Sequence, residues 1–306
     1  MNRREFHRRL AGAALAGTAG AAKASPQGPI ALRGQQGDDP LPVSIMLWTV
    51  FTKLPFEARL EKVAEAGYRH VELVGEFEKW SEEDYRRALG KARELGITFD
   101  ATSGVRHSLA DPAERDAMLD DLKNLVAIAE RLNCPAVILL SGNEVPGMRR
   151  AQQHQSCIEG LKRGAQLIEG KNMRLLLESI DPEENPHCFL TRASEGFEII
   201  RAVNHPQVQF LYDFYHEQVA EGNLIEKLVK NFNLVGLCHI ADVPGRHEPG
   251  TGEIDYTNIY RKLAELNYAH LIAMEFLPRR DPVRTLREAR LQAISAFASA
   301  SAARRS

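Results

Sequence analysis

Short apolar runs alternate with amphipathic segments along the chain from residue 42 onward. Each run has four to seven residues, and most are nearly continuous in Val, Ile, Leu and Phe. This pattern is typical of parallel strands that are buried on both faces. Eight runs are predicted as strands, at Val43–Trp48, His70–Leu73, Ile97–Thr102, Ala136–Ser141, Arg174–Ser179, Val208–Asp213, Leu234–Ile240 and Leu271–Phe276.

Helical patterns fill the segments between these runs. They are predicted at Phe56–Ala66, Glu82–Leu95, Ala113–Leu132, Met148–Gly170, Ala193–Val203, Leu224–Asn231, Tyr256–Leu266 and Asp281–Ala300. Eight strand–helix units in order predict a single-domain α/β fold, a (β/α)8 TIM barrel over residues 42–300 with a tail at 301–306. An open, doubly wound sheet is the structural alternative. It usually has about six strands, and here no G-x-G-x-x-G motif follows a strand.

The first 24 residues have the features of an export signal. A basic start is followed by a Gly/Ala-rich apolar stretch from Leu10 to Ala22, and Ala22-Lys23-Ala24 offers an Ala-x-Ala cleavage site. The pattern Arg3-Arg4-x-Phe6 is typical of a twin-arginine signal, so we expect a periplasmic protein. A basic, Ala-rich tail is the alternative interpretation. Residues 25–41, rich in Gly, Pro and Gln, are predicted to be a linker.

Composition and charge disfavour membrane-spanning and nucleic-acid-binding proteins. The chain is 44% hydrophobic and 26% charged, as in ordinary globular proteins, and no apolar run reaches the roughly 18 residues of a membrane span. Residues 1–24 hold five Lys/Arg and one Glu, so without them the formal charge moves from −2 to −6. A mildly acidic body disfavours nucleic acid as a partner. The four cysteines have no C-x-x-C spacing and are interpreted as ordinary core or surface residues, not as a disulfide framework.

Four successive predicted strands each carry a metal-binding group at or near the C-terminal end. These groups are Glu178, Asp213, His239 and Glu275, separated by 35, 26 and 36 residues, about one strand–helix unit each. In a closed barrel they would meet at the C-terminal rim, where TIM barrels place their active sites. A charged group that ends an apolar strand is costly unless it is paired or binds a metal. Three carboxylates and one imidazole suit one divalent metal, with Mg or Mn favoured over Co or Zn.

Further polar and aromatic groups are predicted to bind substrate at the same rim. His216 lies just beyond the sixth predicted strand, and Arg246 lies in a Gly/Pro-rich loop after the seventh, where it would clamp an anion or a carbonyl. Glu72 and Trp48 end the second and first predicted strands and would line the pocket. A buried salt bridge is the alternative role for Glu72, and core packing is the alternative for Trp48. Glu184 and His187, beyond the fifth strand, could also reach a substrate.

Three stretches of the chain resemble the hydroxypyruvate isomerase family, within the wider group of xylose isomerase-like barrels. The most specific is the loop after the seventh strand, residues 239–253, which reads HIADVPGRHEPGTGE. Residues 211–216, LYDFYH, are similar to the family's sixth-strand segment, and the opening unit shares PFxxR, AG and VE with it. The resemblance extends from about Val43 to Phe276.

The resemblance implies a metal-dependent aldose–ketose isomerase that acts on a small hydroxy-carbonyl or sugar substrate. It implies that Glu178 and Glu275 are catalytic and move a proton between neighbouring carbons. The metal site maps onto these two glutamates together with Asp213 and His239, and His216 and Arg246 would contact the substrate. Further copies of the chain, in a homo-oligomer, are the other partner considered.

Several residues differ from the hydroxypyruvate isomerase pattern, so other functions stay possible. Hydroxypyruvate isomerases usually carry Gln where this chain has His239, and His there resembles the ketose 3-epimerase branch. Ser179 stands where Pro is expected, and the third predicted strand lacks the family's usual Asn. A 3-epimerase, a keto-inositol dehydratase and a non-catalytic exported carbohydrate-binding barrel are the alternatives. A phosphodiester-cleaving barrel would need additional His ligands on early strands and a basic groove, and the sequence shows neither.

Overall fold

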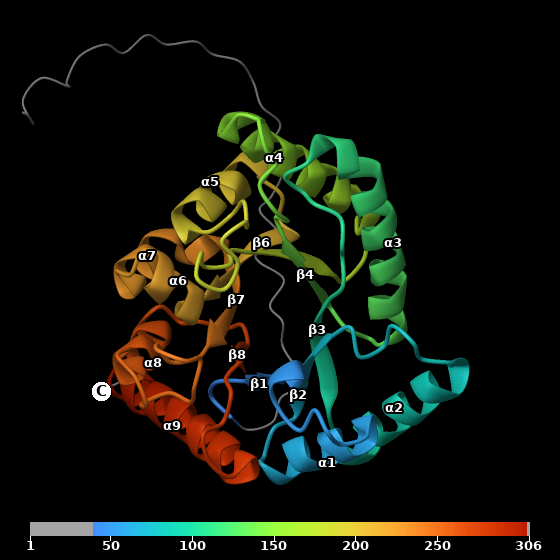
Figure 1. The fold of residues 1–306 in the computed structure, drawn as a ribbon. Coiled ribbons are helices and arrows are strands. Elements are labelled where there is room, and N and C mark those ends of the chain that lie inside the picture. Colours follow the sequence, from blue (N-terminus) through green and yellow to red (C-terminus); the bar gives the residue numbers. More distant parts are fainter. Residues whose placement is uncertain (1–38, 305–306) are drawn as a thin grey trace, which may run out of the picture. The chain divides into compact units, whose positions relative to one another are not determined.

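Eight parallel strands form a closed barrel in a computed structural model that describes residues 39–304 (Figure 1). The strands are β1 Val43–Met46, β2 His70–Val74, β3 Thr98–Ser103, β4 Ala136–Leu140, β5 Arg174–Glu178, β6 Val208–Asp213, β7 Val235–Ile240 and β8 Ile272–Met274. Each strand pairs with the next in the sequence, and β1 pairs with β8 to close the barrel. The predicted TIM barrel is thus confirmed. The predicted export signal and residues 25–38 of the linker lie outside the described residues.

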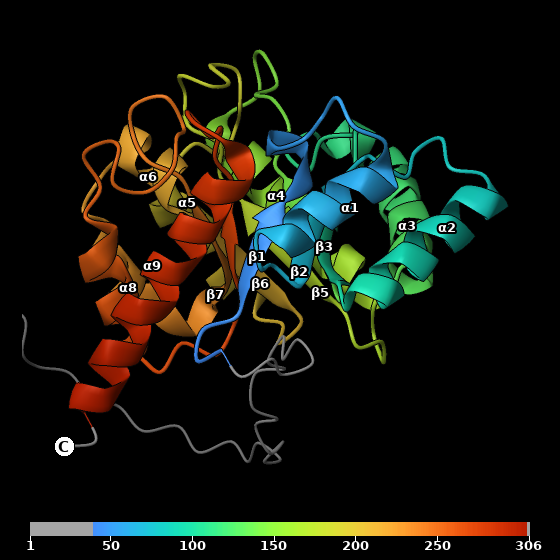
Figure 2. The same cartoon turned by 90° about the horizontal axis from the view of Figure 1, so that it is seen from below.

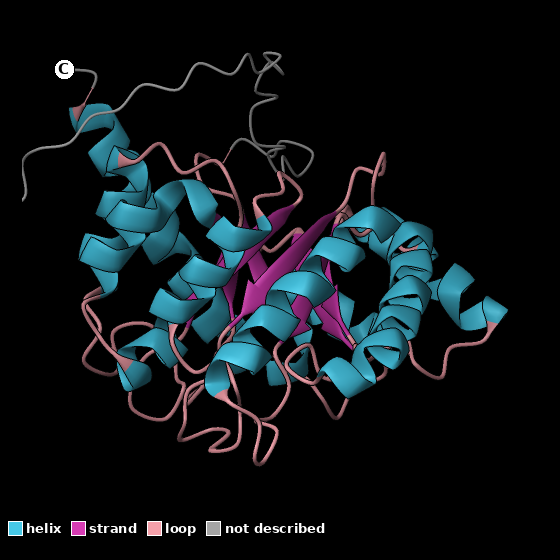
Figure 3. Cartoon of the chain, turned by 90° about the horizontal axis from the view of Figure 1, so that it is seen from above, coloured by secondary structure: helices cyan, strands magenta, loops and turns pink. Residues whose placement is uncertain are grey.

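Helices surround the strands, as Figures 2 and 3 show from two opposite sides. They are α1 Phe56–Glu65, α2 Glu82–Leu95, α3 Arg115–Arg131, α4 Arg150–Leu167, α5 Ala193–Val203, α6 Phe214–Ala220, α7 Leu224–Asn231, α8 Tyr256–Glu265 and α9 Pro282–Ala303. The sequence did not predict α6, which has only seven residues. It begins where Asp213 accepts hydrogen bonds from the backbone N–H groups of Tyr215 and His216. Among residues 39–304, every helix is too short or too polar to cross a membrane.

The core of the barrel has an outer and an inner part. Side chains such as Val71 and Leu73 on β2 pack with the buried faces of the helices. The inner part is a separate cluster of Met46, Ala101, Ala136, Ile138, Leu176, Leu211, Leu237 and Leu271. Because side chains two residues apart point to the same side of a strand, Leu176, Leu211 and Leu237 lie one layer below positions 178, 213 and 239. An apolar layer therefore underlies the C-terminal rim.

The first and last strands are shorter than predicted. Strand β1 ends at Met46 because residues Leu47–Thr49 turn into a 3-10 helix, in which the Thr49 hydroxyl donates a 2.8 Å hydrogen bond to the Met46 carbonyl. The placement of Trp48 at the end of a strand was therefore wrong, since it lies in this turn. Strand β8 ends at Met274, so Glu275 directly follows it. All four cysteines are buried and free.

Candidate active site

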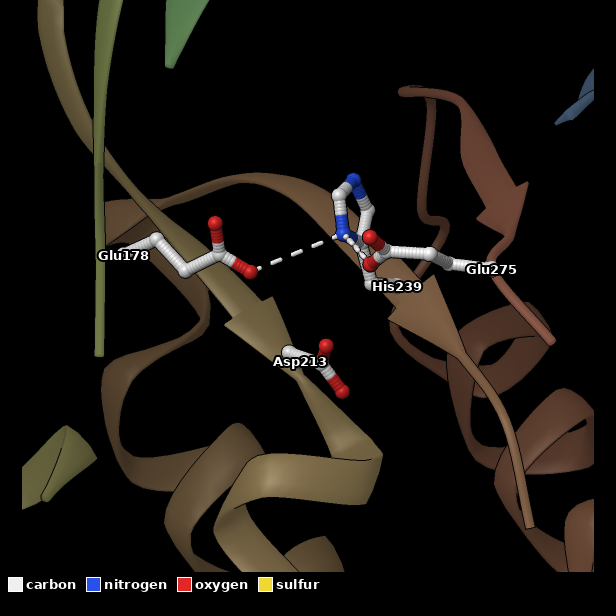
Figure 4. Close-up of side chains that lie close together, drawn as sticks. All are labelled: Glu178, Asp213, His239 and Glu275. Atoms are coloured by element: carbon white, nitrogen blue, oxygen red, sulfur yellow. Dashed lines mark ion pairs between the residues drawn. The ribbon is translucent and has the colours of Figure 1, made fainter. Parts of the chain in front are cut away.

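The four predicted metal ligands lie together at the C-terminal ends of β5 to β8 (Figure 4). Glu178 and Asp213 are the last residues of β5 and β6, and His239 on β7 lies in register with Asp213. All four side chains are buried, and one ligand atom of each lies within 4.8 Å of the others. The structure thus brings the four predicted residues together, and their binding of a metal stays a prediction.

The imidazole of His239 indicates that this cluster fits a metal ion. Its Nδ1 atom lies 2.6 Å from Glu275 Oε2 and 3.6 Å from Glu178 Oε1. Nδ1 and Glu275 Oε2 are both fully buried, and neither has a hydrogen bond of good geometry. Their contacts are ion pairs, with each other and, for Oε2, with Arg246 Nη2 at 2.8 Å. One imidazole nitrogen and carboxylate oxygens that converge in this way have the chemistry of a ligand set for a cation.

The two glutamates of the cluster differ in their affinity for a proton. Burial raises the pKa of Glu178 to about 8. Burial acts on Glu275 in the same direction, but the positive charges of Arg246 and His239 outweigh it and hold the pKa of Glu275 below its usual range. The Arg246 guanidinium lies 2.8 Å from Glu275, from Nη2 to Oε2. At neutral pH the metal-free cluster therefore pairs a protonated with an ionised carboxyl group, the arrangement that acid–base chemistry uses.

Arg246 also links the cluster to the two substrate-binding candidates that follow β5 and β6. Its Nη2 lies 3.3 Å from Asp213 Oδ2, and its Nη1 lies 3.1 Å from His216 Nε2. The same Nη1 donates a 2.6 Å hydrogen bond to the half-exposed Glu184. The structure thus brings Arg246, His216 and Glu184 together beside the predicted metal ligands.

His216 is held in place by a carboxylate that the sequence did not single out. Its Nδ1 lies 2.6 Å from Asp181 Oδ2, and both side chains are almost fully buried. Burial lowers the pKa of His216, but Asp213 and Asp181 outweigh it and raise the pKa to about 9. The only signal in the sequence was an acidic residue three positions after the end of β5. Asp181, Glu184 and His216 themselves form a second group with metal-ligand spacing.

A single buried carboxylate, that of Asp242, organises the loop that carries Arg246. It accepts hydrogen bonds of 2.9 to 3.1 Å from the backbone N–H groups of Val243, Gly250, Thr251, Gly252 and Ile254. A Cβ atom at Gly252 would lie 1.9 Å from the Val243 carbonyl oxygen, so only glycine fits there. The loop is therefore fixed by its own backbone, and Arg246 extends from a rigid support.

Trp48 and Glu72 contact the cluster from the first two strand–helix units. The indole N–H of Trp48 donates a 2.7 Å hydrogen bond to Glu275 Oε1, and the side chain is too exposed, at 37%, to be a core residue. Glu72 on β2 is fully buried, with Oε2 2.9 Å from His239 Nε2. The buried salt bridge considered for Glu72 is thus present, while its contact with a substrate stays a prediction.

Comparison with known proteins identifies relatives of the barrel. A 2-oxo-tetronate isomerase from Pectobacterium atrosepticum is 29% identical over 240 residues, which cover 75% of this chain and 89% of that protein. The hydroxypyruvate isomerase of Escherichia coli K12 is 27% identical over 242 residues, 77% of this chain and 93% of that protein. These relatives are isomerases, the enzyme class that the sequence predicted.

Solved structures and a family model agree on the fold. A crystal structure from Brucella melitensis, described as an AP endonuclease of family 2, superposes with a TM-score of 0.74 at 24% identity and covers 80% of this chain and 96% of that one. At this identity the likeness concerns the fold alone. The family model described as Xylose isomerase-like TIM barrel matches residues 60–294. The resemblance inferred from the sequence is confirmed, and the chain belongs to the xylose isomerase-like TIM barrel family.

Proposed function

We propose that this protein is a metal-dependent isomerase that interconverts a small hydroxy-aldehyde and a hydroxy-ketone, with hydroxypyruvate as the first candidate substrate. The observation that carries this proposal is the pair of buried glutamates at the ends of β5 and β8, Glu178 and Glu275, in one cluster with Asp213 and His239. The names of the curated relatives, 2-oxo-tetronate isomerase and hydroxypyruvate isomerase, support the same reaction class.

Aldose–ketose isomerisation moves a proton between two adjacent carbons. Glu178, Asp213, His239 and Glu275 would hold one Mg or Mn ion, which would act as a Lewis acid on the carbonyl oxygen of the substrate. Glu178 and Glu275 lie at the ends of β5 and β8, so one of these carboxylates would remove a proton from one carbon and the other would return a proton to the neighbouring carbon. The hydroxyl proton of the substrate would pass to the former carbonyl oxygen, and exchange with water would restore the starting protonation of the two glutamates.

Arg246 and His216 would orient the substrate over this pair. Nη2 of Arg246 is paired with Asp213 and Glu275, so a substrate carboxylate would bind Nη1 in place of the half-exposed Glu184, which favours an acid such as hydroxypyruvate over a neutral sugar. Trp48, more than a third exposed beside Glu275, would form one wall of the pocket.

A second candidate is a ketose 3-epimerase or a keto-inositol dehydratase that uses the same residues. The presence of His239, where hydroxypyruvate isomerases usually have Gln, favours this alternative. Both reactions also begin with removal of a proton next to a carbonyl, so they require the same two glutamates.

A substrate panel distinguishes these reactions. The metal-stripped protein is reloaded with Mg or Mn and incubated in deuterated water with hydroxypyruvate, 2-oxo-tetronate, ketohexoses and a keto-inositol. We expect the isomerised product of a hydroxy-carbonyl acid, with deuterium at the carbon that receives the proton. An epimerised ketose or a dehydrated keto-inositol would identify the second candidate. Binding of a sugar without deuterium incorporation would favour a non-catalytic carbohydrate-binding barrel.

We further propose that residues 1–24 direct the folded protein to the periplasm. The support is the Arg3-Arg4-x-Phe6 pattern and the Ala-x-Ala site that ends at Ala24. Cell fractionation tests this: the wild-type chain should appear in the periplasm, and a variant with Arg3→Lys and Arg4→Lys should remain in the cytoplasm. Equal distribution of both chains would contradict the proposal.

A further inference from the structure

The contact between Glu72 and His239 joins two strands on different sides of the barrel. Glu72 lies on β2 and His239 on β7, 167 residues apart, with Oε2 2.9 Å from Nε2. Glu72 is 0% exposed and His239 is 1% exposed. Glu72 therefore lies behind His239, buried away from the solvent.

The two nitrogen atoms of the His239 ring have different neighbours. Nε2 faces Glu72, whereas Nδ1 faces Glu275 at 2.6 Å and Glu178 at 3.6 Å. A neutral imidazole has one N–H donor and one lone pair, and a metal needs the lone pair. If Nε2 carries the hydrogen and donates it to Glu72, the lone pair of Nδ1 points at the two carboxylates. This is the orientation that a metal ligand requires.

The surroundings of Glu72 argue against a purely structural role. On β2, Val71 and Leu73 pack among the helices, so Glu72 points into the barrel, where Met46 of the inner apolar cluster is its partner in register on β1. Placing a carboxylate among apolar side chains is unfavourable, and hydrophobic replacements of buried ion pairs are often neutral or stabilising. An apolar residue at position 72 would serve the packing of this inner cluster at least as well.

We propose that Glu72 is a positioning residue for the metal site. It accepts the Nε2 hydrogen of His239, which fixes the tautomer and the ring plane of that ligand, and it acts on the reaction only through His239. This inference rests on the proposed function, because it assumes that His239 binds a metal. It does not depend on the substrate contact that the sequence suggested for Glu72, which stays a prediction.

Metal titration of the full chain tests this role. The purified protein is stripped with a chelator and titrated with Mn²⁺ in a calorimeter, as wild type, Glu72→Met and Glu72→Gln. We expect Glu72→Met to weaken Mn²⁺ binding by roughly 10- to 100-fold. Glu72→Gln keeps an oxygen that accepts the Nε2 hydrogen, so its loss should be smaller, roughly three- to tenfold. Thermal unfolding of each variant, without metal, checks that the barrel is intact.

A second buried carboxylate–histidine pair provides the matched control. Asp100 on β3 is 3% exposed and lies 3.2 Å from His70 Nδ1, and neither residue contacts the cluster at the C-terminal rim. Asp100 acts electrostatically on Glu72 but touches none of the predicted ligands, so Asp100→Asn should change Mn²⁺ affinity much less than Glu72→Met.

Pulsed electron paramagnetic resonance of bound Mn²⁺ gives a readout that packing alone would not change. The wild-type complex should show coupling to an imidazole ¹⁴N nucleus, which His239→Gln removes and Glu72→Met weakens. If wild-type protein binds no Mn²⁺, the proposed metal site is wrong, whatever Glu72 does. If the wild type binds Mn²⁺ and both Glu72 variants match it in affinity and nitrogen coupling, the role of Glu72 is refuted. If Glu72→Met does not fold, Glu72→Gln alone decides by the same criterion.

Discussion

The indole N–H of Trp48 donates a 2.7 Å hydrogen bond to Oε1 of Glu275, across the seam where the first and last strands of the barrel meet. The other oxygen of Glu275 faces His239 and Arg246. Each oxygen of this carboxylate therefore has its own neighbours, and the hydrogen bond from Trp48 holds the carboxylate plane in one orientation.

Replacement of Trp48 by Phe should lower kcat about tenfold, because a hydrogen bond to a charged group is lost while the ring remains. Steady-state kinetics with the substrate identified in the panel would measure this. The other tryptophan of the chain, Trp80, packs against Phe56 and Tyr85, and Trp80→Phe is the matched control. Equal rates for the two variants would show that the indole N–H has no part in catalysis.

Replacement of Glu178 or Glu275 by Gln should reduce turnover by about 10² to 10⁴-fold, since each variant loses a group that transfers a proton. Far-ultraviolet circular dichroism should still report a folded barrel, because the amide keeps the size of the side chain. Metal content is measured in parallel to separate loss of the metal from loss of proton transfer. If both variants keep near wild-type rates with every candidate substrate, the proposed mechanism is wrong.

The loop that carries Arg246 and is organised by Asp242 should tolerate a methyl group at Gly250 but not at Gly252. At Gly252 a Cβ atom would meet the Val243 carbonyl oxygen at 1.9 Å, so Gly252→Ala must move the loop and with it Arg246. We expect kcat/KM to fall by up to about a hundredfold. At Gly250 no atom lies within 4 Å of the added carbon, and only a positive φ of 87° is strained. Gly250→Ala should keep kcat/KM near the wild-type value, and similar losses for both variants would contradict this account.

Acid should destabilise the barrel through His270, far from the candidate site. Burial lowers the pKa of His270 to about 4, with Arg174 adding to the effect, and Arg174 Nη1 lies 3.3 Å from His270 Nδ1. An unfolded chain titrates its histidines near pH 6.5, so between about pH 6.5 and 4 only the unfolded state takes up this proton. The contribution is fully present above that window and is lost as the pH falls through it.

Relative to His270→Asn, the wild-type protein should therefore lose up to about 3 kcal/mol of unfolding free energy between pH 7 and pH 4. Urea unfolding at a series of pH values measures this difference, and the comparison cancels the titration of all other groups. Parallel stability curves for the two proteins would show that His270 is protonated in the folded barrel as well.

The predicted ligands were accessible from the sequence because parallel strands of a barrel impose a simple rule. A nearly continuous apolar run predicts a strand that is buried on both faces. A carboxylate or imidazole at or near the C-terminal end of such a strand, as with Glu178 and Asp213, is then predicted to lie at the rim of the barrel. The partners of these residues follow no such rule. Asp181 and Glu184 depend on the path of the loop after β5, and the contact of Glu72 with His239 depends on the width of the barrel interior. Trp48 was placed on a strand because its apolar run continues into the turn that Thr49 closes.

The closure of the barrel by β1 and β8 links the proposed metal site to the order in which the chain is synthesised. All four predicted ligands lie in the second half of the sequence, but Trp48 and Glu72, which contact Glu275 and His239, come from the first two strand–helix units. A growing chain thus has every predicted ligand only after β8 is made, and we expect their final orientation only once β8 has joined β1. Because a metal that binds only the closed barrel stabilises it, occupancy of the site should also slow hydrogen exchange along the β1–β8 seam.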